Sequence, residues 1–253
     1  MNTKIYMDNE NLIAGISLKD TSMPENGNMA LHSCTDPSLI LQNRSLLAAS
    51  IGCDLNQFVC ANQTHSPNFY KVTRDDVGRG AEAKETAIEN TDALYTFEPN
   101  IVLCTFTADC VPVILYDHST GLVGVIHSGW QGTIKEITLK MIDYLKENET
   151  CDPKNLYIHI GTAISQDKFE VDQDVYDQFK NLSYADEYMY FNEKTNKYHI
   201  SNQQTVKRQC ELAGVPSAHI TIDETCTYIN NEGFSYREDK KAGRHLTFVM
   251  KKQ

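Results

Sequence analysis

The sequence has no hydrophobic run long enough to cross a membrane and no export signal. Its longest apolar segments, such as 111–116 and 122–126, are far shorter than the roughly 18 residues that a membrane-spanning helix needs. The first ten residues are polar and lack the apolar stretch of a signal peptide. We therefore expect a cytoplasmic protein that does not bind a membrane.

Basic residues are scarce relative to acidic ones. The chain has 23 Lys and Arg against 34 Asp and Glu, which gives a formal net charge of −11. Repulsion between this charge and a polyanion argues against nucleic acid as a partner. A local basic pocket for a single phosphate group is compatible with the same composition.

Paired metal motifs are also missing. None of the eight cysteines belongs to a Cys-x-x-Cys pair, and no His-x-His occurs in the chain. The first absence argues against a zinc ribbon or a thioredoxin-like site. The second argues against a multicopper oxidase, whose copper centres need many histidines in paired motifs. In a cytoplasmic chain we expect the cysteines to be reduced thiols.

The signals that are present predict one domain over residues 1–253, because no repeat, low-complexity tract or linker interrupts the chain. Helices are predicted after the cap and proline at 36–37, after a capping box at Thr133 and Glu136, around 171–179, and after Ser201. The second of these helices has an apolar stripe at positions 134, 137, 141, 142 and 145. Strands are predicted at 101–107, 111–116, 122–126, 156–160, 219–223 and 246–250, with a turn at 117–121. Pro112 indicates that the strand 111–116 is an edge strand or contains a bulge. Several strand pairs are joined as in hairpins, which favours an α/β or α+β fold with mixed sheets.

Three residues with metal-binding side chains follow or interrupt strand-like runs: His65, Cys110 and His127. Imidazole and thiolate suit Zn²⁺ and also copper, and three protein ligands with an open fourth position are typical of catalytic zinc. The spacing matches no general zinc motif. By itself it favours a buried free thiol and two hydrogen-bonded histidines. Asp109 precedes Cys110 and, pointing the other way along a strand, is expected to support the site or bind backbone.

Further segments strengthen the metal hypothesis. They read Gln-Thr-His-Ser at 63–66, Thr-Asp-Ala-Leu at 91–94, Thr-Ala-Asp-Cys-Val-Pro-Val-Ile-Leu-Tyr-Asp at 107–117 and Gly-Val-Ile-His-Ser-Gly-Trp-Gln-Gly-Thr at 124–133. Together they resemble the YfiH laccase-domain family, which has been called both multicopper polyphenol oxidase and purine nucleoside phosphorylase. Matches that extend the resemblance over almost the whole chain are Asn43, Arg44, 161–164, 169–171, Asn202, Cys226, 234–237, Gly243 and Arg244.

The resemblance implies a single domain in which two mixed sheets are sandwiched between helices, in four layers α/β/β/α. It implies a Zn²⁺ site built from His65, Cys110 and His127. It also implies phosphorolysis of adenosine, inosine, guanosine and S-methyl-5′-thioadenosine to the free base and ribose-1-phosphate, together with adenosine deaminase activity. Cys226 stands in a family-like position and is included among the expected catalytic residues, with a buried structural cysteine as the alternative interpretation.

Arginines are the natural phosphate contacts, because the guanidinium fork matches phosphate oxygens. The candidates are Arg44, Arg237 and Arg244, and Asn202 is expected to contact substrate. The chain departs from the family pattern at three positions, where the family usually has Arg, Pro and Arg: Gln131, Thr162 and Lys19. These departures put substrate range and phosphate affinity in question.

Other functions stay open at this point. A His/Cys/His site that binds copper would suit a laccase-like polyphenol oxidase. A non-catalytic zinc-binding or scaffold protein would gain support if Cys226 completed the ligand set. A thiol hydrolase would use Cys110 as nucleophile and His127 as base. We expect a monomer or a small homo-oligomer.

Overall fold

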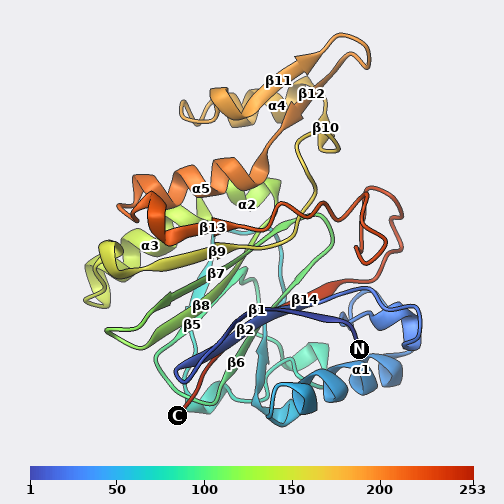
Figure 1. The fold of residues 1–253 in the computed structure, drawn as a ribbon, viewed down its shortest axis with the longest axis vertical. Coiled ribbons are helices and arrows are strands. Elements are labelled where there is room, and N and C mark those ends of the chain that lie inside the picture. The colour runs from blue at the N-terminus through green and yellow to red at the C-terminus, as the bar shows by residue number, and fades with distance from the viewer.

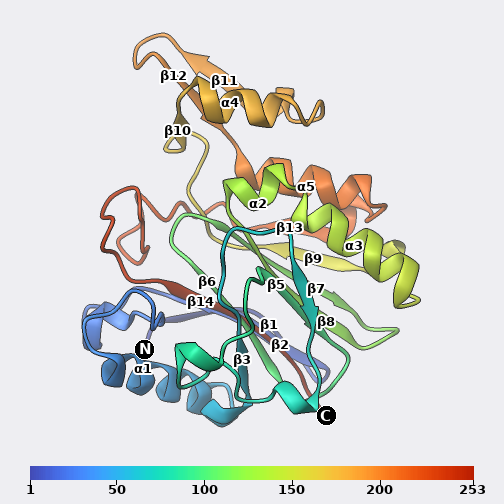
Figure 2. The same ribbon diagram turned by 180° about the vertical axis from the view of Figure 1, so that it is seen from behind.

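Two mixed β-sheets pack face to face, and helices cover both outer faces, in a computed structural model that describes all residues 1–253 (Figures 1 and 2). This confirms the predicted four-layer α/β/β/α fold. The first sheet is antiparallel except for its last pair. Its strands, in spatial order, are β1 (Thr3–Asp8), β2 (Leu12–Ser17), β14 (His245–Lys251), β6 (Val102–Thr107) and β3 (Phe58–Cys60).

The second sheet carries the central hairpin of the molecule. Its two outermost pairs are parallel and its inner pairs are antiparallel. The hairpin is formed by β7 and β8, as the predicted turn after residue 116 indicated. In spatial order the strands are β13 (Ile220–Ile222), β9 (Tyr157–Ile160), β7 (Val111–Asp117), β8 (Leu122–Ser128), β5 (Ala93–Thr96) and β4 (Phe69–Lys71).

Helix α1 (Pro37–Ser50) covers the first sheet, and α2 (Trp130–Ile134), α3 (Ile137–Asn148) and α5 (Asn202–Leu212) lie over the second (Figures 1 and 2). Helix α1 begins as predicted, with Asp36 accepting from the Ser38 N–H at 2.9 Å. None of the helices combines the length and the apolar composition that crossing a membrane would take.

Short 3₁₀ turns complete the connections. They are η1 (Pro24–Gly27), η2 (Leu55–Gln57), η3 (Arg74–Asp76), η4 (Lys84–Thr86), η5 (Pro153–Asn155), η6 (Asp186–Tyr188) and η7 (Ser217–His219).

The apolar residues separate into three buried layers, because successive side chains of a strand face opposite sides of its sheet. In β6, Val102 and Cys104 belong to the layer under α1, whereas Leu103 faces the second sheet. In β7, Val113 joins the layer under α3 and α5, and Ile114 faces the first sheet. Both sheets are therefore apolar on both faces, which explains why their strands are continuous hydrophobic runs in the sequence.

A third, antiparallel sheet extends beyond the four layers together with helix α4 (Gln173–Lys180) (Figures 1 and 2). The helix confirms the prediction around 171–179, but the sequence did not predict the sheet. Its strands, in spatial order, are β10 (Glu170–Val171), β12 (Lys197–Ile200) and β11 (Met189–Asn192). Val171, expected in a helix with Phe179, lies in β10 instead. Both residues are buried in the same small cluster, so the shared burial mimicked helical periodicity.

The prediction that Pro112 marks an edge or a bulge is wrong, because β7 lies between β9 and β8. Pro112 accepts from the Gly161 N–H at 2.8 Å, just beyond the end of β9. Proline has no N–H for the return bond. The Gly161 carbonyl accepts from Gln203 Nε2 of α5 instead, at 2.8 Å. A helix side chain thus makes proline tolerable in a central strand.

The predicted capping box at Thr133 and Glu136 is also wrong. Thr133 lies inside α2, where its hydroxyl contacts Ser128 Oγ at 2.8 Å and the Gly129 carbonyl at 3.2 Å. Glu136 adopts a left-handed backbone with φ of 61°, which separates α2 from α3. The backbone therefore breaks where the sequence pattern would start a helix.

His245 at the start of β14 makes the stability of the fold sensitive to acid. Its Nδ1 donates to the Ser17 carbonyl at 2.7 Å, and its Nε2 accepts from the Phe234 N–H at 2.8 Å, so the neutral ring uses both nitrogens. Burial lowers the pKa of His245 from 6.5 to about 4. Between pH 6.5 and 4 the unfolded chain binds a proton at His245 that the folded chain does not bind. The stabilisation of the folded state by the neutral, buried ring is therefore complete above pH 6.5 and is lost as the pH falls to about 4.

We expect urea unfolding of the wild-type chain to show a loss on the order of 3 kcal/mol from this group between pH 7 and 4. His245→Gln should be less stable at pH 7 and should depend less on pH over that interval. His32 and His159, whose pKa values burial also lowers to about 4, keep part of the dependence in the variant. An unchanged pH slope in the variant would refute the assignment.

Candidate functional site

The hairpin of β7 and β8 brings Cys110 and His127 together. Its register pairs Pro112 with His127. Cys110 immediately precedes β7, two residues before Pro112, so the hairpin brings it to the same end of the sheet as His127. The residues that separate Cys110 from His127 in the sequence are therefore those of the β7–β8 hairpin.

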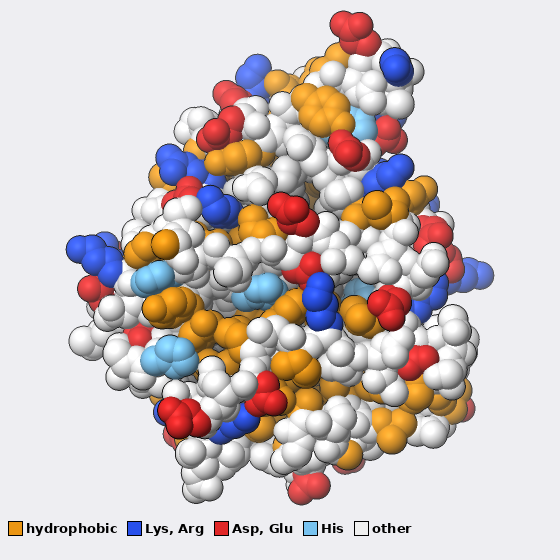
Figure 3. Space-filling view, viewed as in Figure 1, with side chains coloured by type: hydrophobic (Ala, Val, Ile, Leu, Met, Phe, Trp, Pro, Cys, Tyr) orange, Lys and Arg blue, Asp and Glu red, His pale blue; other side chains and the backbone are white.

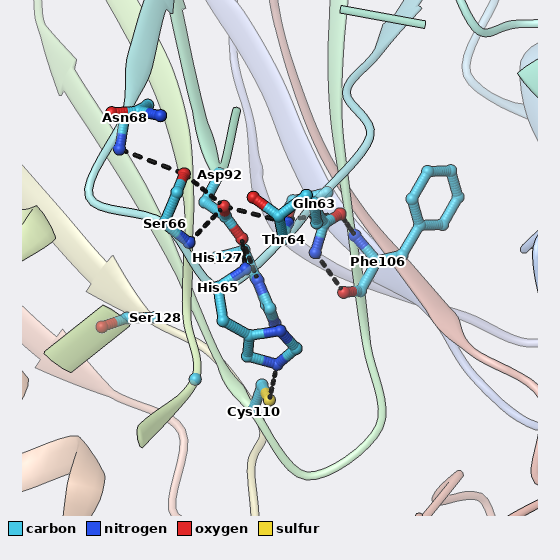
Figure 4. A network of polar contacts seen from close by, with 12 residues as sticks. Gln63, Thr64, His65, Ser66, Asn68, Asp92, Phe106, Cys110, His127 and Ser128 are labelled. Atoms are coloured by element: carbon cyan, nitrogen blue, oxygen red, sulfur yellow. Dashed lines mark hydrogen bonds and ion pairs between the residues drawn. The ribbon is translucent and has the colours of Figure 1, made fainter. Parts of the chain in front are cut away.

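His65 reaches the same place from the loop between β3 and β4. Its backbone has a φ of 57°, and its Nε2 lies 3.9 Å from Cys110 Sγ. Its ring meets that of His127 edge to face, with centroids 4.8 Å apart. One ligand atom from each of His65, Cys110 and His127 lies within 4.8 Å of the others. The three residues singled out in the sequence thus form one cluster (Figure 4).

Asp92, just before β5, organises this cluster, a role that was not predicted from the sequence. Its Oδ1 contacts His127 Nδ1 at 2.8 Å and accepts from the His65 N–H at 3.0 Å (Figure 4). Its Oδ2 accepts from the Thr64 and Ser66 N–H groups and from Ser66 Oγ. The side chain is fully buried. An acidic residue directly before a buried strand, inside the Thr-Asp-Ala-Leu segment, was the signal available in the sequence.

The cluster fits a zinc ion. Two donors on one tetrahedral zinc lie roughly 3.5 Å apart, since Zn–S is about 2.3 Å and Zn–N about 2.0 Å. The separation of His65 Nε2 and Cys110 Sγ is close to this value, at 3.9 Å. Because Asp92 holds Nδ1 of His127, Nε2 of that ring is available as a ligand atom. The group has three members, and Cys226 is not one of them.

The electrostatics of the cluster favour a thiolate. Burial raises the pKa of the Cys110 thiol, but His127 and His65 outweigh burial and lower it to about 6. Burial lowers the pKa of His127, but Cys110 and Asp92 outweigh burial and raise it to about 9. Burial likewise opposes ionisation of Asp92, yet His127 and Ser66 bring its pKa down to about 2. A thiolate is the form of cysteine that binds metal.

Gly129 leaves the space in which the ligands meet, so Gly129→Ala is expected to disrupt the cluster. A Cβ at this position would lie 2.7 Å from His65 Cδ2 and 2.9 Å from Cys110 Sγ. We expect zinc affinity to fall at least about tenfold, since displaced support of metal ligands costs that much. Gly132→Ala is the matched control, because its Cβ would meet no atom closer than 3.4 Å. Competition titration with a chelator measures both variants, and equal affinities would contradict the prediction.

The cluster opens into a cavity of about 680 Å³. The cavity is walled by aromatic rings from four segments of the chain: Phe106, Trp130, Phe169 and Tyr236. The cationic side chains that line it are Lys84, Arg237 and Arg244, and its single carboxylate is Asp109. Both oxygens of Asp109 accept hydrogen bonds from the protein. The prediction that Asp109 points away from Cys110 along a strand is wrong, because Asp109 lies before β7 with a φ of 83° and lines the same cavity as Cys110.

Three of the predicted substrate contacts line this cavity. Arg237 donates to the carbonyls of two residues near Phe169 and packs over the Phe169 ring. Arg244 lies over the Tyr236 ring, and burial lowers its pKa. Asn202, at the start of α5, donates from Nδ2 to the Ser128 carbonyl at 3.0 Å, while its Oδ1 is buried without a hydrogen-bond partner.

The structure places Arg44 elsewhere and gives it a structural role in place of the predicted phosphate contact. Its side chain is buried and does not line the cavity. Its guanidinium donates to the carbonyls of Met29, Gly80 and Ala81 at 2.6–2.8 Å. These bonds tie α1 to two loops, so the charge is used within the fold.

The structure places Cys226 away from the metal-binding group, as its alternative interpretation as a buried structural cysteine predicts. It is buried, and its Sγ accepts from the Ser165 N–H at 3.3 Å. It pairs with Ala163 in an isolated bridge, outside the cavity and outside the metal-binding group. The thiol of Cys226 therefore contributes to the contact between its own loop and the loop that contains Ala163 and Ser165.

The three departures from the family pattern lie outside the cavity. Gln131 lies in α2. Thr162 donates to Asp223 at 2.7 Å, at the junction with β1. Lys19 lines a separate, polar cavity of about 540 Å³. None of the three side chains touches the metal-binding group.

Comparison with known proteins places this arrangement in a family. The family model described as "Multi-copper polyphenol oxidoreductase laccase" matches residues 14–252. A Bacillus subtilis (strain 168) protein named purine nucleoside phosphorylase YlmD is 32% identical over 252 residues, which cover 97% of this chain and 91% of that protein. A protein of an unknown prokaryotic organism, named adenosine deaminase RL5, is 30% identical over 254 residues, which cover 99% and 92% of the two chains.

A solved structure agrees with these sequence matches. The crystal structure of the Bacillus licheniformis hypothetical protein YfiH superposes with a TM-score of 0.91 at 30% identity, covering 97% of this chain and 98% of that one. The resemblance drawn from the sequence motifs is therefore confirmed. Because the family match spans nearly the whole chain, this protein belongs to the family described as multi-copper polyphenol oxidoreductase laccase.

Proposed function

We propose that this protein is a zinc-dependent purine nucleoside phosphorylase with adenosine deaminase activity. The observation that carries the proposal is a single cavity in which a His/Cys/His group meets aromatic walls and three cationic side chains. The names of the relatives from Bacillus subtilis and from the unknown prokaryote support the same two reactions.

The walls suit a purine nucleoside. A volume of about 680 Å³ lies within the usual range of about 300–1,000 Å³ for small-molecule sites. Phe106, Trp130, Phe169 and Tyr236 provide flat apolar surfaces on which a base can stack. Asn202 Oδ1 is a buried acceptor without a partner, and it suits an N–H or O–H donor of a substrate.

The charge of the cavity suits phosphate. Lys84, Arg237 and Arg244 contribute three positive charges to a chain whose net charge is −11. On the face shown in Figure 3, acidic and basic side chains are interspersed, with no broad basic surface for a polyanion. A concentrated positive charge in an acidic protein favours a small anion, and guanidinium groups match phosphate oxygens.

The chemistry follows from these positions. In phosphorolysis a phosphate oxygen bonds to C1′ of the ribose, the bond from C1′ to the purine nitrogen breaks, and the purine leaves with a proton. Arg237 and Arg244 would hold the phosphate, and the aromatic walls would hold the base. His65, Cys110 and His127 would hold the metal, with Asp92 orienting His127. A bound zinc ion supplies Lewis-acid chemistry.

The test combines metal analysis with product analysis on one sample. The purified protein is assayed for zinc and copper, then incubated with adenosine with and without phosphate. One zinc per chain with adenine released only in the presence of phosphate supports the phosphorylase. Inosine formed without phosphate supports the deaminase.

Other outcomes would overturn the proposal. About four coppers per chain with oxidation of phenols would assign a polyphenol oxidase. Turnover by the metal-free protein, lost on alkylation of Cys110, would assign a thiol hydrolase. Zinc-loaded protein that converts none of adenosine, inosine, guanosine and S-methyl-5′-thioadenosine would favour a non-catalytic zinc-binding role.

A further inference from the structure

Asp109 holds an unusual backbone conformation directly beside a metal-binding residue. Its φ is 83°, in the left-handed region that residues other than glycine rarely adopt. Such conformations persist where the surrounding structure holds them in place, and they concentrate at functional sites. The carbonyl of Asp109 accepts from the Ile164 N–H at 3.0 Å, and Ile164 itself lines the cavity. The peptide group between Asp109 and Cys110 is therefore held in place by a hydrogen bond from Ile164, which belongs to another loop.

The carboxylate of Asp109 ties down a distant segment. Its Oδ1 accepts from Thr227 Oγ1 at 2.6 Å. Its Oδ2 accepts from Ser235 Oγ at 3.0 Å and from the Arg237 N–H at 2.7 Å. Thr227 and Ser235 are each only 1% exposed, so the two hydroxyl donors are buried. The segment 227–237 also carries Tyr236, which lines the cavity yet is 48% exposed.

We propose that Asp109 is a positioning residue that couples the segment 227–237 to the metal ligand Cys110. Asp109 and Cys110 are consecutive, so a shift of the segment is transmitted through one peptide to the Sγ atom. Both carboxylate oxygens are already occupied by protein donors, which leaves Asp109 poorly placed to take a proton from substrate. The proposal rests on the proposed function for its zinc site and its turnover measurement, whereas the hydrogen-exchange measurement depends on neither.

Two substitutions of Asp109 separate hydrogen bonding from charge. Asp109→Asn keeps the tolerance for positive φ. Its Oδ1 can accept from Ser235 and Arg237, and its Nδ2 can donate to the Thr227 hydroxyl oxygen. Asp109→Gly also tolerates positive φ but removes all three bonds. Ser235→Ala removes one bond without changing the loop that carries Cys110.

The measurements begin without substrate. Zinc affinity is measured by chelator competition, Co²⁺ substitution reports the thiolate–metal absorption band, and hydrogen exchange reports amide protection in 228–237. We expect Asp109→Gly to weaken zinc binding about 10–100-fold, as loss of groups supporting a ligand does, and to lose protection in 228–237. Ser235→Ala should act in the same direction with a smaller effect. Asp109→Asn should stay within about threefold of wild type.

A matched control excludes a general loss of stability. Asp76 is another buried aspartate that ties a loop, accepting from Thr73, Tyr70 and Arg79 outside the cavity. Asp76→Ala should lower the Tm and leave zinc affinity and protection of 228–237 unchanged.

Two results would overturn the proposal. The first is Asp109→Gly with wild-type zinc affinity and wild-type protection of 228–237. The second is Asp109→Asn with normal zinc binding and unchanged KM but a kcat lowered more than about 100-fold, which would make Asp109 a proton-transferring group. Because zinc affinity and hydrogen exchange need no substrate, they test the coupling even if the chain turns over no nucleoside.

Discussion

Cys110→Ala is expected to abolish zinc binding and turnover while the fold is kept. Cys110 supplies the only sulfur of the metal-binding group, and two imidazoles alone leave an incomplete ligand set. Its thiolate also balances the charge of His127 beside it. We expect zinc affinity and kcat/KM to fall by more than about 100-fold, because loss of a ligand costs more than loss of a group that supports one.

The fold should survive because the thiol faces a cavity rather than the packed core. The zinc content of the purified variant, its circular dichroism spectrum and its thermal unfolding check these points. Cys226→Ala is the matched control: it removes a buried thiol that lies outside the cavity, and it should keep one zinc per chain. Full zinc occupancy in the Cys110 variant would remove the basis for the proposed metal centre.

Asp92→Ala is expected to damage both the metal centre and the stability of the chain. The substitution leaves the N–H groups of Thr64, His65 and Ser66 without their acceptor, and it leaves the buried ring of His127 without its partner. Removing one partner of a buried charged pair costs about 3–5 kcal/mol. For a chain of this size that cost lowers the Tm by about 10 °C. Zinc affinity should fall about 10–100-fold.

The control for Asp92→Ala is Asp223→Ala. Asp223 is also a largely buried carboxylate that accepts from several groups, including Tyr6, Thr162 and Lys4, but it lies outside the cavity. Its loss should lower the Tm without changing zinc affinity. If the two variants lost the same stability and both kept wild-type zinc affinity, Asp92 would be a structural residue only.

Local patterns predicted the elements that the structure shows most clearly. The Asp-Pro start of α1 and the apolar stripe of α3 depend on neighbours within one helix. The strands β7 and β8 and the turn between them were also readable, and with them the pairing that sets Cys110 beside His127. The identities of His65, Cys110 and His127 as ligand candidates came from residue type together with family motifs.

The fold class, the family and the chemical types gathered at the candidate site therefore follow from local patterns and motifs. Which of several residues of one type takes part in the site depends on the tertiary contacts. Arg44 and Arg244 are both arginines in matching motifs, yet carbonyls from distant loops surround Arg44, whereas Arg244 lines the cavity. Asp92 gained its role for the same reason: its partners come from loops that only folding brings near it. Burial and hydrogen-bond partners are set by such long-range contacts, which no local pattern encodes.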